Sequence, residues 1–181
     1  MKRQIKFYKK YVDSYYRTFG DKLFFDIYKI QKVIEEKINN NSTIFVCGNG
    51  GSAAVSNHFM CDYNKAIKLT SKKKKFPKFL SLTNSIELIT AISNDQDYSK
   101  IFSEQIENFC KKGDCLIILS CSGNSKNVLE VSKIAKKKKL FIISLVGFNS
   151  NSKLKKNSNI YLNLNIKNYG ISEDIFKVLC I

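Results

Sequence analysis

The sequence predicts an α/β fold in three layers (αβα), with a sheet of about five parallel strands behind a two-helix N-terminal arm. Two long helical patterns open the chain of 181 residues. After residue 42, short continuous apolar runs alternate with helical stretches. Continuous apolarity favours strands buried on both faces, and the intervening helices are typical of parallel βαβ units.

The N-terminal helical arm is predicted over residues 1–40. Its first segment, up to about Phe19, is amphipathic and rich in aromatic residues. A terminal helix of that kind often packs against a neighbouring subunit. The second helix is predicted over 21–39, because apolar side chains recur there at helical spacing and form one face. They are Leu23, Phe24, Ile27, Ile30, Val33, Ile34 and Ile38.

Residues 41–181 form the second predicted unit, a single doubly wound domain with no internal repeat and no linker inside it. Its ligand is expected at the carboxyl ends of the strands. The expected strands cover residues 43–47, 78–82, 115–120, 140–147 and 159–165. The expected helices cover residues 52–68, 85–93, 98–109, 124–138 and 171 to the end.

The formal net charge is +16, and many lysines lie in runs such as Lys72–Lys75 and Lys136–Lys139. Basic surfaces can attract nucleic acid, acidic membranes or anionic metabolites. The sequence has no RNP, zinc-finger or arginine-rich signature. We therefore favour a solvated basic surface over a nucleic-acid site.

A cytoplasmic location without membrane insertion is expected. No stretch reaches the roughly 20 consecutive apolar residues that a membrane span needs. The basic N-terminus lacks the apolar core and cleavage site of a signal peptide. The cysteines form no CxxC pair and several lie in apolar runs, which favours free, mostly buried thiols in a reducing compartment. They are Cys47, Cys61, Cys110, Cys115, Cys121 and Cys180.

A glycine-rich loop follows the first predicted strand. It reads Cys47-Gly48-Asn49-Gly50-Gly51-Ser52 and leads into a helix. Glycines let the backbone approach a ligand closely, and the amides and dipole of a helix start favour an anion. A plain strand-to-helix turn with an N-cap serine is the alternative interpretation.

A serine-rich loop follows the third predicted strand, at Ser120-Cys121-Ser122-Gly123-Asn124-Ser125. Three hydroxyl groups and the neighbouring amides can surround a phosphate without any lysine, whereas an N-cap alone needs one serine. Two such loops at one sheet edge favour a phosphate site. Neither loop matches a P-loop or a dinucleotide fingerprint, so nucleotides are not favoured.

The segments GNGGSAAVSNHF, LTNSIELITAISNDQDYSKIF and SCSGNSKNVLEV resemble the phosphoheptose isomerase family of the sugar-isomerase (SIS) type, from about residue 21 to the end. The resemblance implies a flavodoxin-like SIS fold, a phosphorylated sugar as partner and a homotetramer. It also implies isomerisation of sedoheptulose 7-phosphate to a heptose phosphate, which feeds surface-polysaccharide and lipopolysaccharide precursors.

The same resemblance implies which residues bind the substrate. The phosphate would be held by Ser120, Ser122 and Ser125, with Ser52 and the adjoining Gly50 and Gly51 of the first loop. Cys121 stands where the family usually has threonine. The sugar hydroxyls would face Asn49, Asn94 and Asp95.

Aldose–ketose isomerisation through an enediol needs a base for a carbon-bound proton and an acid for the oxygens. Asp62 falls at the family's catalytic glutamate, and His58 lies four residues before it, on the same helix face. Some family members hold zinc, so His58 and Asp62 are also candidate metal ligands, and the cofactor stays open.

The last predicted helix departs from the family. The family's catalytic histidine falls on Ile181 or on Cys180, and its glutamine-type ligand on Glu173 or Ser172, depending on the alignment. The domain thus looks cut short at its C-terminal helix, through a truncated gene or a diverged, shortened paralogue.

Three functions stay open. The leading one is an aldose–ketose isomerase in which Asp62 is the base and water, His58 or the Cys180 thiol is the acid. The first alternative is a catalytically impaired module that only binds phosphosugars, which the missing histidine favours. The second is a regulatory or interaction protein, which only the basic charge favours.

Overall fold

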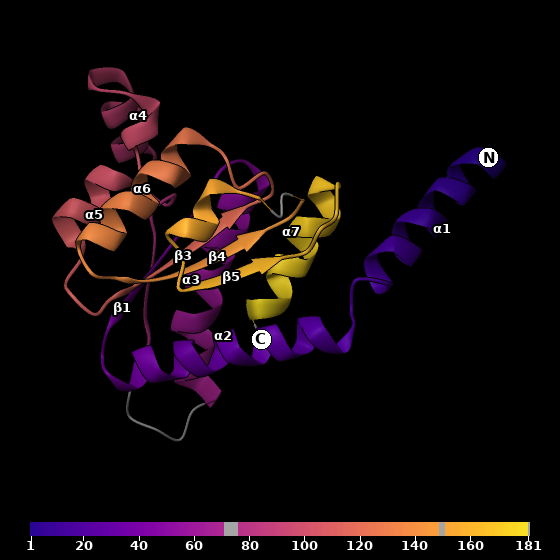
Figure 1. The fold of residues 1–181 in the computed structure, drawn as a ribbon, viewed down its shortest axis with the longest axis horizontal. Coiled ribbons are helices and arrows are strands. Elements are labelled where there is room, and N and C mark those ends of the chain that lie inside the picture. The colour runs from indigo at the N-terminus through magenta and orange to yellow at the C-terminus, as the bar shows by residue number, and fades with distance from the viewer. Residues whose placement is uncertain (71–75, 149–150, 181) are drawn as a thin grey trace.

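Across the described residues, five parallel strands form one sheet in the order β2-β1-β3-β4-β5 (Figure 1). This computed structural model describes residues 1–70, 76–148 and 151–180, without the side chains of residues 67, 68, 70 and 180. The strands are β1 (Thr43–Gly48), β2 (Lys78–Ser81), β3 (Cys115–Ser120), β4 (Phe141–Val146) and β5 (Ile160–Asn163). Every pair of neighbouring strands runs parallel, which confirms the predicted sheet.

The helices alternate with the strands, as a βαβ pattern requires. The α-helices are α1 (Lys2–Tyr16), α2 (Asp21–Asn39), α3 (Gly51–Thr70), α4 (Ile86–Asp95), α5 (Ser103–Phe109), α6 (Lys126–Lys137) and α7 (Tyr169–Lys177). Short 3-10 helices are η1 (Tyr98–Lys100), η2 (Lys153–Lys156) and η3 (Val178–Cys180). None of the helices in the described parts of the chain is both long and apolar enough to cross a membrane.

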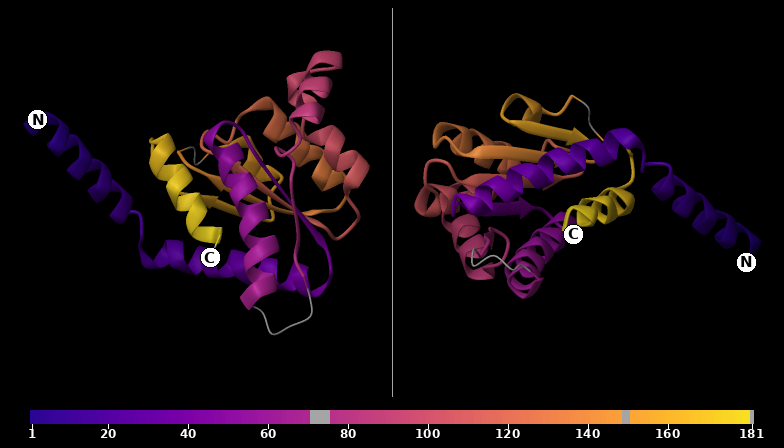
Figure 2. Two further views of the ribbon diagram at one scale, coloured as in Figure 1. Left: turned by 180° about the vertical axis from the view of Figure 1, so that it is seen from behind. Right: turned by 90° about the horizontal axis from the view of Figure 1, so that it is seen from below.

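Each face of the sheet carries its own apolar core, because successive strand residues point to opposite faces. Ile44 and Val46 of β1 face α2, α3 and α7. Phe45 and Cys47 face the other layer, which α5 and α6 supply. The three-layer arrangement predicted from the sequence is therefore confirmed (Figure 2).

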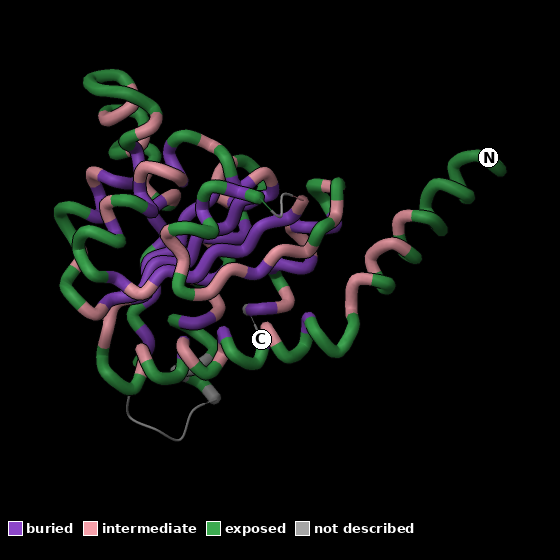
Figure 3. The backbone as a smooth tube through the Cα atoms, in the orientation of Figure 1, coloured by how far each residue is buried: buried purple, intermediate pink, exposed green. Residues whose placement is uncertain are grey.

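The two N-terminal helices behave differently. Leu23, Ile27, Ile30 and Ile34 bury one face of α2 in the first core, so α2 covers the sheet. No residue of α1 is buried, and this helix projects from the body (Figures 1 and 3). The predicted boundary near residue 40 falls between α2 and β1, but the projecting arm consists of α1 alone.

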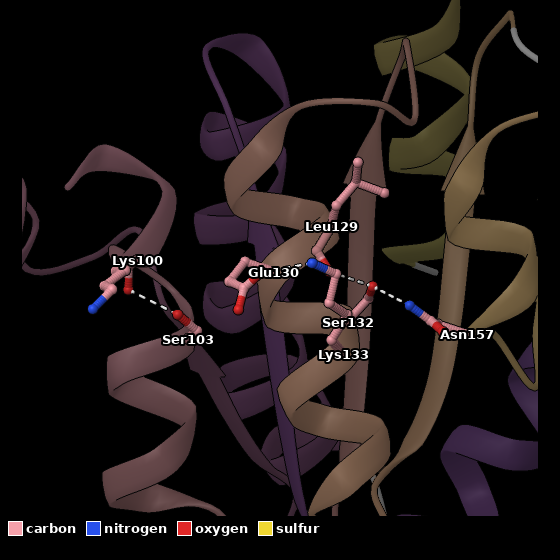
Figure 4. A network of polar contacts seen from close by, with 7 residues as sticks. All are labelled: Lys100, Ser103, Leu129, Glu130, Ser132, Lys133 and Asn157. Atoms are coloured by element: carbon pink, nitrogen blue, oxygen red, sulfur yellow. Dashed lines mark hydrogen bonds and ion pairs between the residues drawn. The ribbon is translucent and has the colours of Figure 1, made fainter.

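Polar contacts fix α6 beside the second core. The fully buried Ser132 donates to the Leu129 carbonyl oxygen at 2.7 Å and accepts from Asn157 Nδ2 at 2.9 Å (Figure 4). Lys133 and Glu130 form an exposed ion pair on the same helix. Ser132 thereby links α6 to the segment after η2, and α6 is the helix that the serine-rich loop enters.

Two expectations about the elements are wrong. A continuous helix over 98–109 is replaced by η1 and α5, because the backbone of Phe102, with a φ of −101°, departs from α-helical geometry between them. Burial on both faces does not hold for β2, an edge strand on which Lys78 and Leu80 are exposed.

The cysteines agree with the prediction of free, mostly buried thiols. Cys47, Cys115 and Cys121 are buried, Cys110 is partly buried and Cys61 is exposed, and all five are free. The side chain of Cys180, together with Ile181 and the run Lys72–Lys75, lies outside the described residues.

Candidate functional site

A cavity of about 230 Å³ opens at the carboxyl ends of β1 and β3. This is the position where doubly wound sheets bind their ligands. Both loops singled out in the sequence contribute to it. Its lining residues are Asn49, Gly50, Gly51, Ser52, Ser120, Cys121, Ser122, Ser125, Tyr169 and Glu173.

The first loop turns sharply into α3. Gly50 has a φ of 56°, a left-handed conformation that glycine adopts without strain. Gly51 then begins the helix, and the buried Ser52 lies in its first turn. The first amides of a helix have no partner within the helix, so the start of α3 presents donors and a positive dipole end to the cavity.

The second loop places hydroxyl groups opposite that helix start. Ser120 Oγ accepts a hydrogen bond from the Gly123 amide at 3.1 Å, and Ser122 Oγ accepts one from the Asn124 amide at 3.3 Å. A hydroxyl that accepts from an amide can still donate its own hydrogen to an anion. Ser125 is the N-cap of α6 but makes no capping hydrogen bond through its side chain.

A pair of side-chain amides joins the two loops. Asn49 Nδ2 donates to Asn127 Oδ1 at 2.9 Å, and Asn127 Nδ2 donates to Asn49 Oδ1 at 2.7 Å. Tyr98 of η1 donates to the same Asn49 oxygen at 3.2 Å. Asn49 is predicted from the sequence to face the sugar, whereas no sequence motif points to Asn127 or Tyr98. A hydrogen-bonded pair of asparagines from two loops cannot be recognised in a sequence until the two loops are known to lie side by side.

Helix α7 closes the cavity with Tyr169 and Glu173. Glu173 Oε1 accepts a hydrogen bond from Ser52 Oγ at 3.2 Å and from Cys121 Sγ at 3.9 Å. Burial and the Glu173 charge raise the pKa of the Cys121 thiol to about 11, so this thiol is neutral at pH 7. Of the two candidates for the glutamine-type position, Glu173 faces the cavity. Ser172 is buried and donates to the Asn168 carbonyl oxygen instead.

His58 and Asp62 lie on α3 but outside this cavity. His58 Nε2 lies 3.0 Å from Asp62 Oδ2, and both side chains are partly exposed. His58 follows Ser52 by six residues, which is about 240° around a helix. The pair therefore lies on a different side of α3 from Ser52. Within one chain, His58 and Asp62 do not reach the two loops.

Asn94 and Asp95 are also outside the cavity. They are exposed at the end of α4, where Asn94 Nδ2 donates to Asp95 Oδ1 at 2.9 Å. Helix α4 has no buried residue, and it extends from the body near the α5–α6 side (Figure 1).

A zinc ion does not fit the donors that the described residues bring together. His58 and Asp62 contact each other, and no group of three His, Cys, Asp or Glu residues that could hold a metal occurs in the described part of the chain. Glu173 is engaged with Ser52 instead of this pair. Two protein ligands fall short of the three or four that bound zinc takes.

The cavity suits a small anion attached to a polar body. Its hydroxyl groups and helix-start amides can donate to an anion, and the described residues that line it include no lysine or arginine. Tyr169 also lines the cavity but was not predicted from the sequence, in which only its position before Gly170 in the last helix pointed to it.

The comparisons with known proteins agree with this fold. The family model described as SIS domain matches residues 7–147, more than half of the chain. The phosphoheptose isomerase of Campylobacter concisus is 38% identical over 116 residues, which are 64% of this chain and 60% of that protein. The phosphoheptose isomerase of Helicobacter pylori (strain ATCC 700392 / 26695) is 40% identical over 112 residues, covering 62% and 57%.

The matched region therefore spans about 60% of the length of these curated relatives. In overall fold, the chain superposes on the phosphoheptose isomerase structure from Neisseria gonorrhoeae with a TM-score of 0.85, covering 99% of this chain and 93% of the other at 24% identity. Since the family model covers both loops of the cavity, the chain belongs to the SIS domain family.

Proposed function

We propose that this protein binds a phosphorylated sugar and isomerises sedoheptulose 7-phosphate to a heptose phosphate, in the synthesis of surface-polysaccharide and lipopolysaccharide precursors. The observation that carries the proposal is the cavity between the glycine-rich loop and the serine-rich loop. Ser52, Ser120, Ser122 and Ser125 supply its hydroxyl donors. The names of the relatives that are 38% and 40% identical supply the substrate.

The phosphate of the sugar would lie on the Ser120–Ser125 loop, with its charge balanced by hydroxyl and amide donors. The sugar body would then extend past Asn49 toward the cavity mouth. This orientation uses each hydroxyl as a donor, since two of them already accept from backbone amides.

The isomerisation moves a proton between two adjacent carbons through an enediol. Asp62 would remove the carbon-bound proton, and His58 or water would serve the oxygens. His58 Nε2 donates to Asp62 Oδ2, so the imidazole holds the carboxylate in place and can exchange a proton with it. No step is assigned to zinc, which remains a hypothesis from the family resemblance.

The position of His58 and Asp62 leads us to propose a homotetramer. In this assembly, the pair of one copy would lie at the cavity of another copy. The α-helices α1 and α4 have no buried residue. A free amphipathic helix of α1's length is marginal in water, so a partner surface would stabilise it. Apolar side chains exposed on α1 are Ile5, Phe7, Tyr8, Val12 and Tyr16.

Light scattering tests the assembly. We expect the mass of four chains at micromolar concentration and a smaller particle for a double variant, Tyr8→Asp with Val12→Asp, on the exposed side of α1. A wild-type monomer under these conditions contradicts the tetramer.

The cytoplasmic location belongs to the same proposal and is supported by the free thiols among the described residues.

Turnover of sedoheptulose 7-phosphate by the purified protein tests the activity directly. Product formation that depends on Asp62 supports the isomerase. Phosphosugar binding without turnover supports the second candidate, a binding module. One observation favours this candidate: His58 and Asp62 lie outside the cavity of their own chain.

A further inference from the structure

The carboxylate of Glu173 lies at the start of α3, inside the cavity. Its Oε1 accepts from Ser52 Oγ, and a Cβ atom placed on Gly51 would overlap the carboxyl group. The carboxylate therefore touches the first two residues of the helix. This is the place where helix-start amides and the helix dipole stabilise a negative charge.

The charges around Glu173 do not neutralise it. Lysine and arginine are missing from the described residues that line the cavity, and Cys121, its other polar neighbour, stays a neutral thiol. The adjacent Asp174 faces away, toward the Tyr11 hydroxyl of α1 at 3.3 Å. The cavity thus holds one uncompensated carboxylate in a protein of net charge +16.

We propose that Glu173 occupies the anion position at the start of α3 and competes there with the phosphate of the ligand, so that Glu173 sets how tightly the cavity binds phosphorylated compounds. The inference rests on the proposed function, because it takes the cavity to be a phosphosugar site. It adds a residue that determines how tightly the cavity binds a phosphate.

The competition follows from a shared donor. Ser52 has one hydroxyl hydrogen, and in this structure it is donated to Glu173. A phosphate that uses Ser52 must therefore displace the carboxylate or accept a like charge at contact distance.

Binding of inorganic phosphate, measured by calorimetry, tests the inference with three variants. Glu173→Gln keeps the shape and removes the charge, and Glu173→Ala also empties the position. Asp174→Asn removes the same charge one residue away, from a side chain outside the cavity. We expect Kd to fall about tenfold or more for both Glu173 variants, because a like charge at contact distance is removed, and to change less than about twofold for Asp174→Asn.

The variant Ser52→Ala tests whether Glu173 and the phosphate compete for the hydroxyl hydrogen of Ser52. In the wild-type background we expect it to change Kd by less than about threefold, because its hydrogen is already donated to Glu173. In the Glu173→Ala background the hydroxyl is released to the phosphate, and the same change should weaken binding about tenfold. Equal effects in the two backgrounds contradict a shared donor.

Unchanged or weaker phosphate binding by both Glu173 variants overturns the inference, as does an equal gain in Asp174→Asn. Phosphate binding to none of these proteins at millimolar concentration overturns it too, together with the phosphate site. Tighter binding by the Glu173 variants without any turnover of sedoheptulose 7-phosphate leaves it standing and removes only the isomerase proposal.

Discussion

Asn49 and Asn127 exchange two hydrogen bonds, of 2.9 and 2.7 Å, between their side-chain amides. The first residue belongs to the glycine-rich loop after β1, and the second to the first turn of α6. Asn127 is almost fully buried and also accepts from the Val128 amide. The pair therefore sets the distance between the two loops that would hold the phosphate, so Asn49 would act on a ligand through the position of the loops as well as through contact.

Replacing Asn127 with alanine should loosen both loops at once. Asn49 loses its donor and acceptor partner, so we expect a loss of roughly 1–3 kcal/mol in unfolding free energy. Phosphosugar affinity should fall as well. Urea denaturation and calorimetry measure the two effects. Asn157→Ala removes a hydrogen bond to the buried Ser132 outside the cavity, so it should lower stability and leave affinity unchanged.

Replacing Ser122 with alanine tests the serine-rich loop. The hydroxyl accepts from the Asn124 amide and should donate to the phosphate. Loss of a hydrogen bond to a charged group should weaken phosphosugar binding by about 1.5–3 kcal/mol. Ser99→Ala on η1, outside the cavity, is the control and should bind normally. Equal affinity of the two variants in calorimetry would remove this loop from the site.

The sheet and both loops could be predicted because their signals are local. A continuous apolar run such as 115–120 indicates a buried strand. Glycines and serines between a strand and a helix indicate a turn whose amides and hydroxyl groups can face a ligand. The break between η1 and α5 could not be predicted, because the buried Ile101, Phe102 and Ile106 also have the spacing of one continuous helix.

Contacts between residues far apart in the sequence could not be predicted either. The spacing of His58 and Asp62 correctly predicts that they meet on one helix face, and their side chains are 3.0 Å apart. The same spacing does not say where that face points, and here it is away from the cavity. The contact of Ser52 with Glu173, 121 positions later, depends on how α7 packs on α3.

The raised pKa of Cys121 predicts slow alkylation. With a pKa of about 11 instead of its usual value near 9.0, about one Cys121 thiol in a thousand is ionised at pH 8. Iodoacetamide should therefore label the exposed Cys61 first, and the Cys121 rate should rise about tenfold per pH unit up to pH 11. Mass spectrometry of the labelled peptides measures both rates.

The same pKa has a consequence for stability. The folded thiol keeps its proton at pH values where the unfolded thiol has lost it. The contribution of Cys121 to stability is therefore complete below pH 9 and is lost as pH rises from about 9 through 11. Cys121→Ser should show a smaller decline over this range in denaturant titrations. An equal decline in both proteins would show that Cys121 is not its source.

The proposed base is tested by separating turnover from binding. Asp62→Asn keeps the shape of the side chain and its contact with His58 but removes the basic carboxylate. Because the hydroxyl groups and amides of the two loops, and not Asp62, would bind the phosphate, we expect phosphosugar affinity to stay within about twofold, while kcat falls by about 10²–10⁴. Glu130→Gln breaks an exposed ion pair on α6 with the same change of charge, and it should alter neither quantity. If Asp62→Asn turns over sedoheptulose 7-phosphate as fast as the wild type, another group is the base. His58 and Asp62 would then have only a structural role on α3.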